Sequence, residues 1–79
     1  MPFYFFVWTP EVVAHLDEHG VSVDEFEEVV MHPDVEDISR STGNPIAIGS
    51  TSAGRQLCCI FKRLDEDLIE PVTAYDVGD

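Results

Sequence analysis

The pattern of the chain changes at Pro33, and this change constrains the fold more than any other feature of the sequence. Before Pro33 the chain carries the start and stop signals of two helices. After Pro33, short apolar segments alternate with turn residues, as they do in β-strands. Helices in one part and strands in the other predict an α+β fold. With 79 residues there is room for one domain, 1–79, and no linker.

Thr9-Pro10 and Gly20 mark the two ends of the first helix. Thr9 is placed to cap its start, with Pro10 at the first helical position. Gly20 is a natural stop. The helical spacing predicts an apolar stripe made of Val12, Val13 and Leu16.

The second helix has the clearest start signal in the chain. Ser22 and Glu25 are spaced as a capping box, in which each side chain bonds the backbone N–H of the other residue. Val21 and Phe26 are spaced as the hydrophobic staple around that box. The helix should end at His32-Pro33 and bury a face made of Phe26, Val29 and Val30.

Five segments are predicted to be strands: residues 3–8, 35–40, 45–50, 56–62 and 68–77. Residues 56–62 are apolar on both alternating faces, which suits a central strand, and Pro71 should disturb the ladder of the last one. Short connections favour an antiparallel meander. We therefore predict two helices on one face of a mostly antiparallel four- to five-stranded sheet, in the order β-α-α-β-β-β-β.

The aromatic segment from Phe3 to Trp8 is also apolar on both faces. It predicts a core strand covered on both sides, with a partner or homodimer surface as the alternative. It is the longest apolar run in the chain, far short of the roughly 18 residues of a membrane span. It also lacks the basic region and cleavage site of a signal peptide. We therefore predict a cytoplasmic protein with no membrane contact.

Charge is the feature of composition that most limits function. Sixteen Asp and Glu oppose four Lys and Arg, for a formal net charge of −12. Such a surface repels phosphate backbones and favours a basic protein partner or a high-salt environment. The helical acidic positions are interpreted as solvated helix faces, or alternatively as a docking surface for such a partner. These positions are Asp17, Glu18, Asp24, Glu25, Glu27 and Glu28.

Two motifs have structural interpretations that we prefer to chemical ones. The adjacent Cys58 and Cys59 point to opposite faces of a strand, so we interpret them as two reduced, buried residues. Residues 15–19 spell the H-x-x-E-H pattern of some zinc peptidases, with Glu11 one turn earlier. A catalytic zinc site also needs a third ligand and a large cleft, for which this domain has little room. We predict no metal and no cofactor.

Several strings, in order and spacing, resemble the BrnT family of bacterial toxin–antitoxin pairs. They are Trp8 at the end of an aromatic segment, His19-Gly20-Val21-Ser22, the acidic helix from Asp24 to Val30 with Pro33 beyond it, Ile46-Ala47-Ile48-Gly49, Gly54-Arg55 and Val72-Thr73-Ala74. The resemblance implies the fold of the RelE ribonuclease toxins. It also implies metal-independent RNA cleavage that blocks translation, and an antitoxin as partner.

The resemblance also indicates which residues would cleave RNA. The candidates are the cations Arg55 and Arg40, with Lys62 or Arg63, and His19 or Tyr75 as the acid or base. BrnT-like toxins carry an arginine-rich segment after the last strand's Ser/Thr-Ala, where this chain reads Tyr75-Asp76-Val77-Gly78-Asp79. Two hypotheses follow: a protein-interaction module that has lost RNA cleavage, which the charge favours, and an active ribonuclease toxin neutralised by an antitoxin.

Overall fold

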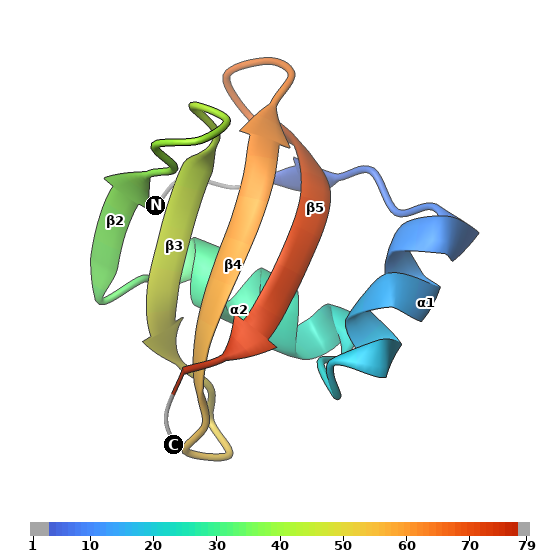
Figure 1. Ribbon diagram of the computed structural model, residues 1–79, viewed down its shortest axis with the longest axis vertical. Coiled ribbons are helices and arrows are strands. Elements are labelled where there is room, and N and C mark those ends of the chain that lie inside the picture. Colours follow the sequence, from blue (N-terminus) through green and yellow to red (C-terminus); the bar gives the residue numbers. More distant parts are fainter. Residues whose placement is uncertain (1–3, 78–79) are drawn as a thin grey trace.

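The computed structural model describes residues 4–77, in which two helices pack with a five-stranded sheet. In chain order the elements are β1 (Phe5–Phe6), α1 (Pro10–Glu18), α2 (Val23–Met31), β2 (Val35–Ile38), β3 (Pro45–Ser50), β4 (Gln56–Arg63) and β5 (Leu68–Asp76). The strands lie in the order β1-β5-β4-β3-β2, so β2 to β5 form an antiparallel meander (Figure 1). The α+β class and the predicted element order are confirmed.

Both helices begin where their capping residues predict. The Thr9 hydroxyl accepts a hydrogen bond from the N–H of Val12 at 3.3 Å. Ser22 and Glu25 form the complete capping box, with both bonds at 3.1 Å. Gly20 ends α1 with φ +72°, a backbone conformation that residues with a Cβ rarely adopt.

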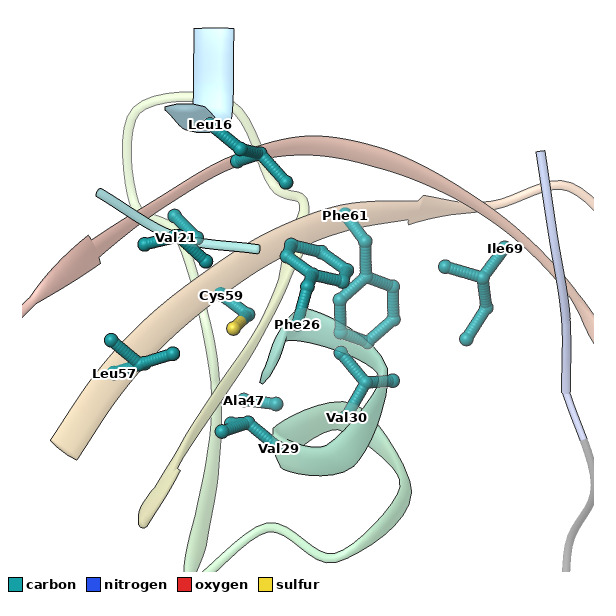
Figure 2. Close-up of a cluster of buried hydrophobic side chains, with 11 residues drawn as sticks. Leu16, Val21, Phe26, Val29, Val30, Ala47, Leu57, Cys59, Phe61 and Ile69 are labelled. Carbon is teal, nitrogen blue, oxygen red and sulfur yellow. The ribbon is translucent and has the colours of Figure 1, made fainter. Parts of the chain in front are cut away.

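The hydrophobic core lies between α2 and the sheet, and α1 adds a side chain from beside β5 (Figures 1 and 2). Phe26 is fully buried and meets the Trp8 ring edge to face, with ring centroids 5.4 Å apart. The strands contribute Ala47, Leu57, Cys59, Phe61, Ile69 and Ala74. The predicted stripe of α1 is partly wrong: Leu16 is fully buried, but Val13 is 39% exposed.

The central strand of the sheet is β4, as its apolar pattern predicts. Cys59 faces the core and Cys58 the opposite side of the sheet; both are buried and neither forms a disulfide. Burial raises the pKa of the Cys59 thiol to about 12, so that thiol stays protonated at neutral pH. The prediction of two free, buried cysteines is confirmed.

The N-terminal strand is shorter and more peripheral than predicted. Of the predicted segment 3–8, residue 3 lies outside the described residues, and only Phe5–Phe6 is strand. This strand lies at the sheet edge, parallel to β5, and Phe5 is 58% exposed, so the prediction of a strand covered on both faces is wrong. Its ladder includes the bond from Val7 N–H to the Ile69 carbonyl. In a parallel ladder the next donor would be residue 71, and Pro71 has no N–H.

Pro71 also coincides with the irregularity predicted for the last strand. Phe61 lies opposite Pro71 and Ile60 opposite Thr73, which leaves Val72 as an extra residue between them. In residues 4–77 no helix is long and apolar enough to cross a membrane.

Candidate functional site

The four Lys and Arg residues of the chain lie at two opposite ends of the sheet. Arg40 is in the turn before β3, because β2 ends at Ile38, two residues earlier than predicted. Lys62 and Arg63 are the last residues of β4 and lie at the same end of the sheet as Arg40, because Ile46 at the start of β3 pairs with Ile60. Arg55 lies in the turn after β3. The six residues of β3 separate the two turns by roughly 17 Å at about 3.4 Å per residue.

The cations at the Arg40 end do not gather on one face. Lys62 and Arg63 are neighbours on a strand, so their side chains leave opposite faces of the sheet. The Arg63 guanidinium lies over the Tyr4 ring, 5.6 Å from its centroid, and donates to the Tyr4 hydroxyl at 3.4 Å. Lys62 and Arg63 therefore do not converge on a common phosphate.

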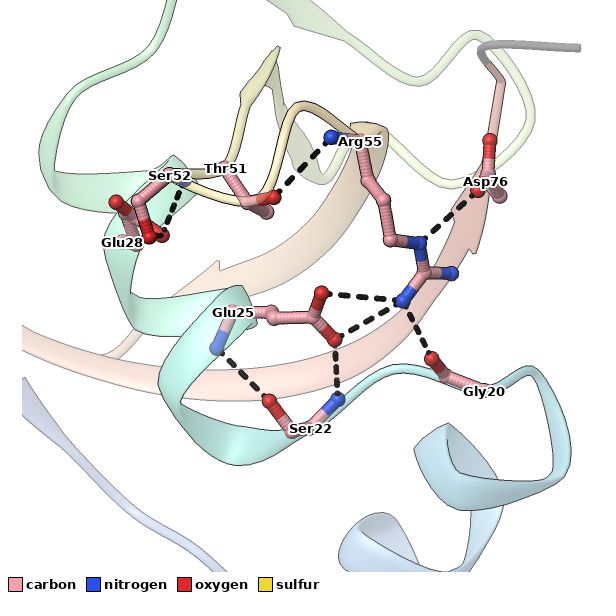
Figure 3. Close-up of polar contacts among 8 residues, drawn as sticks. All are labelled: Gly20, Ser22, Glu25, Glu28, Thr51, Ser52, Arg55 and Asp76. Atoms are coloured by element: carbon pink, nitrogen blue, oxygen red, sulfur yellow. Dashed lines mark hydrogen bonds and ion pairs between the residues drawn. The ribbon is translucent and has the colours of Figure 1, made fainter.

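Arg55, the cation that matches an arginine of the BrnT pattern, is held by two carboxylates (Figure 3). Its Nη1 donates to both carboxylate oxygens of Glu25, at 3.0 and 3.1 Å. Its Nε donates to Asp76 at 3.2 Å, and Nη1 also reaches the Gly20 carbonyl at 2.7 Å. The hydrogen bond to Asp76 raises the pKa of Arg55 above its already high ordinary value, so the guanidinium stays charged.

The elements around Arg55 explain this arrangement. Glu25 is the third residue of α2, and the capping box with Ser22 fixes its carboxylate at the helix start. Asp76, at the end of β5, pairs with Leu57 of β4 and so lies beside the turn that carries Arg55. The Arg55 N–H donates to Thr51 Oγ1 across that turn. Arg55 thus joins the α1–α2 connection, α2 and β5, and its donors on Nη1 and Nε point at acceptors within the protein.

The other candidate site residues, His19, Tyr75 and Arg40, do not lie together in the structure. His19 follows α1 next to Gly20, so it lies at the Arg55 end of the molecule, and Arg40 lies at the opposite end. Tyr75 precedes Asp76 on β5 but leaves the other face of the strand, opposite Cys58. Interaction with the Cys58 side chain raises the pKa of the Tyr75 hydroxyl, which makes it a poorer proton donor at neutral pH. Arg55, His19 and Tyr75 are therefore at one end, on two faces.

The two histidines of the H-x-x-E-H motif contact each other. The His15 and His19 ring centroids are 5.1 Å apart, and His15 Nε2 lies 2.9 Å from the Thr73 hydroxyl. Among residues 4–77 there is no group of three His, Cys, Asp or Glu that could hold a metal ion.

Three of the six helical acidic residues have structural partners that the sequence did not indicate. Glu25 holds Arg55, Glu27 accepts a bond from the Trp8 indole N–H at 2.8 Å, and Glu28 accepts one from the Ser52 N–H at 3.0 Å. These carboxylates tie α2 to the N-terminal segment and to the β3–β4 turn. The remaining three, Asp17, Glu18 and Asp24, are exposed.

One face of the sheet is turned away from α2 (Figure 1), and the strand register places apolar residues on it. In register, Val35, Ile48, Cys58 and Tyr75 form one row across β2 to β5. Val35 is 54% exposed and Tyr75 42% exposed. This face is the second surface, after the acidic helices, on which a partner could bind.

Comparison of the chain with protein-family models, curated proteins and solved structures found no match. The BrnT-like resemblance therefore stays a hypothesis that rests on the residues quoted above.

Proposed function

We propose that this protein is a BrnT-like, RelE-related interaction module that binds a basic protein partner, such as an antitoxin, and does not cleave RNA. The observation that carries the proposal is the pairing of Arg55 with Glu25 and Asp76. An RNA phosphate that approached Arg55 would meet two carboxylates bonded to its Nη1 and Nε at 3.0–3.2 Å. Repulsion between those carboxylates and the phosphate opposes that approach.

The distribution of the other cations supports the same proposal. Stabilising a cleavage transition state requires donors preorganised around one phosphate. Here Arg40, Lys62 and Arg63 are a strand length away from Arg55, and Arg63 is stacked on Tyr4. A net charge of −12 also disfavours the approach of RNA over long distances.

The same charge favours a basic protein. Association between surfaces of opposite charge is faster and more selective than between neutral ones. Val13 is an exposed apolar side chain one helical turn before the acidic Asp17 on α1, and it provides contact area for such a partner. We further propose that the interaction takes place in the cytosol, in keeping with two cysteines that are both free.

Inducible expression in bacteria tests the proposal directly. The chain is expressed beside Arg55→Ala and Arg40→Ala variants, while growth and the integrity of cellular RNA are followed. We expect normal growth and intact RNA at high soluble expression for all three proteins. Growth arrest with RNA cleavage by the unchanged chain would overturn the proposal in favour of a ribonuclease toxin.

The two variants identify the residues responsible if cleavage occurs. Arg40→Ala tests the second candidate cation, which is exposed in a turn at the other end of the sheet. Arg55→Ala removes bonds to Glu25, Asp76 and Gly20, so its melting curve must show that the variant is folded. Cleavage lost only in a folded Arg55→Ala protein would assign the chemistry to Arg55.

A further inference from the structure

A groove of about 710 Å³ runs between α1, the start of α2 and the residue that precedes the α1 cap. One wall is a single helical face of α1, formed by Pro10, Val13, Ala14 and Asp17. The other side is formed by Trp8, Thr9, Val21, Ser22 and Val23. It is an open groove rather than an enclosed cavity. The wall is apolar except at Asp17, and Val13 and Ala14 are exposed in it.

The polar atoms that line this groove are largely used within the protein. The hydroxyls of Thr9 and Ser22 accept the capping bonds of the two helices. The Trp8 indole N–H is bonded to Glu27. Within residues 4–77 the carboxylate of Asp17 has no such side-chain partner, and it is exposed. The groove therefore offers apolar surface and one negative charge to a ligand.

We propose that this groove is the docking site for a helical segment of the basic partner, one that inserts an apolar side chain beside a Lys or Arg. The inference rests on the proposed function and specifies its surface. The apolar side chain would contact Val13, Ala14 and the Trp8 ring. The cation would lay its aliphatic stem along the same surface and reach Asp17 with its charged end. Helices recognise apolar grooves in this way through residues spaced three or four apart.

Charge decides against a second copy of this chain as the occupant. Each copy carries a net charge of −12. A symmetric pairing through the groove would bring the two Asp17 carboxylates to the same interface, because both copies use the same surface. The four cations of the chain lie elsewhere: in the turns on either side of β3 and at the end of β4. A basic partner supplies the positive charge that Asp17 in the groove lacks.

Trp8 is the one tryptophan of the chain and lines the groove, so its fluorescence reports occupancy. The probe is a synthetic helical peptide with leucine along one face and lysine beside it. We expect saturable binding that changes the Trp8 emission. The same peptide with serine in place of leucine, or glutamate in place of lysine, should not bind. Val13→Ser and Asp17→Asn should each weaken binding at least about fivefold, as for a contact of more than about 1 kcal/mol.

Matched variants outside the groove locate the binding. Val35→Ser removes a valine of β2 that is 54% exposed, more than the 39% of Val13. Glu66→Gln removes an exposed carboxylate from the β4–β5 turn. Both should bind the peptide as the unchanged protein does. If only Val35→Ser loses peptide binding, the binding site is on the open sheet face. That result would overturn the groove as the docking site and would leave the proposed function standing. Binding of the serine peptide with equal affinity would show unspecific charge attraction and also overturn it. Failure of the proposed function itself would appear separately, as RNA cleavage during expression.

Discussion

Ser22 gives the sharpest test of how this small domain is stabilised. Its hydroxyl accepts from the Glu25 N–H, and the Glu25 carboxylate returns a bond to the Ser22 N–H while also holding Arg55. In Ser22→Ala the first bond is lost, and the N–H of Glu25 has no acceptor within the helix start. The expected cost is about 1 kcal/mol, within the range of about 0.5–2 kcal/mol for lost helix caps.

This cost is a sizeable part of the stability of the domain. A chain of 79 residues is expected to have a free energy of unfolding of about 4–12 kcal/mol. A loss of about 1 kcal/mol should lower the melting temperature by about 4–8 °C. It should also lower the urea midpoint by about 0.5–1 M.

Urea unfolding followed by Trp8 fluorescence and by circular dichroism measures the effect. Ser22→Asn is the matched control, because asparagine caps helices as well as serine does and adds no charge. We expect Ser22→Asn to unfold close to the unchanged protein and Ser22→Ala well below it. If the two variants unfold at the same urea concentration, the hydroxyl bond does not contribute and the argument from the capping box is refuted.

Three further predictions concern packing, pH and salt. Gly49→Ala should destabilise the protein by about 1–3 kcal/mol, because a Cβ there would lie 3.3 Å from the backbone atoms Asp34 N and His32 O; an unchanged urea midpoint would contradict this. Cys59 ionises near pH 9.0 when unfolded and near 12 when folded, so stability should be unaffected below pH 9 and fall above it. The fall should be up to about 1.4 kcal/mol per pH unit, and Cys59→Ala should lose this part of the pH dependence. Raising the salt concentration from about 0.01 M to about 1 M shortens the Debye length from about 30 to 3 Å. Because this screens the repulsion within the acidic surface, the melting temperature should rise. A flat or falling melting temperature would show that net repulsion does not limit stability.

The helices and the meander could be predicted because their signals are local. The Thr9 cap, the Ser22 capping box and the left-handed Gly20 each depend on residues within a few positions along the chain. The apolar pattern of β4 likewise agrees with its central place in the sheet, where Cys58 and Cys59 are both buried. In contrast, β1 pairs with residues more than sixty positions away, and its length depends on Pro71 in another strand. No local pattern in Phe3–Trp8 carries that information.

The candidate site could be predicted only as a set of residue types. Arg55 is 30 residues from Glu25 and 21 from Asp76, so each of the three residues is interpreted separately from the sequence. Glu25 is interpreted as part of a capping box, which the structure confirms. Asp76 is noted only as part of the segment that stands where BrnT-like toxins carry arginines. The meander brings them together, and no signal in one sequence indicates that contact. The exposure of Val13 was missed for a related reason, since an apolar helical stripe does not say which of its members the sheet covers.

The Arg55 cluster also connects the fold with the proposed absence of RNA cleavage. The fold brings Glu25 and Asp76 to the same turn, where their charges would repel each other without a cation between them. One guanidinium and two carboxylates leave the cluster with a net charge of −1. A phosphate added there would face that negative charge and would compete for the donors that hold α2 to β5. Arg55 thus offsets part of the negative charge of Glu25 and Asp76. Under the proposed function Arg55 is a structural residue that ties α2 to β5, and this use of its donors opposes a second use in binding RNA.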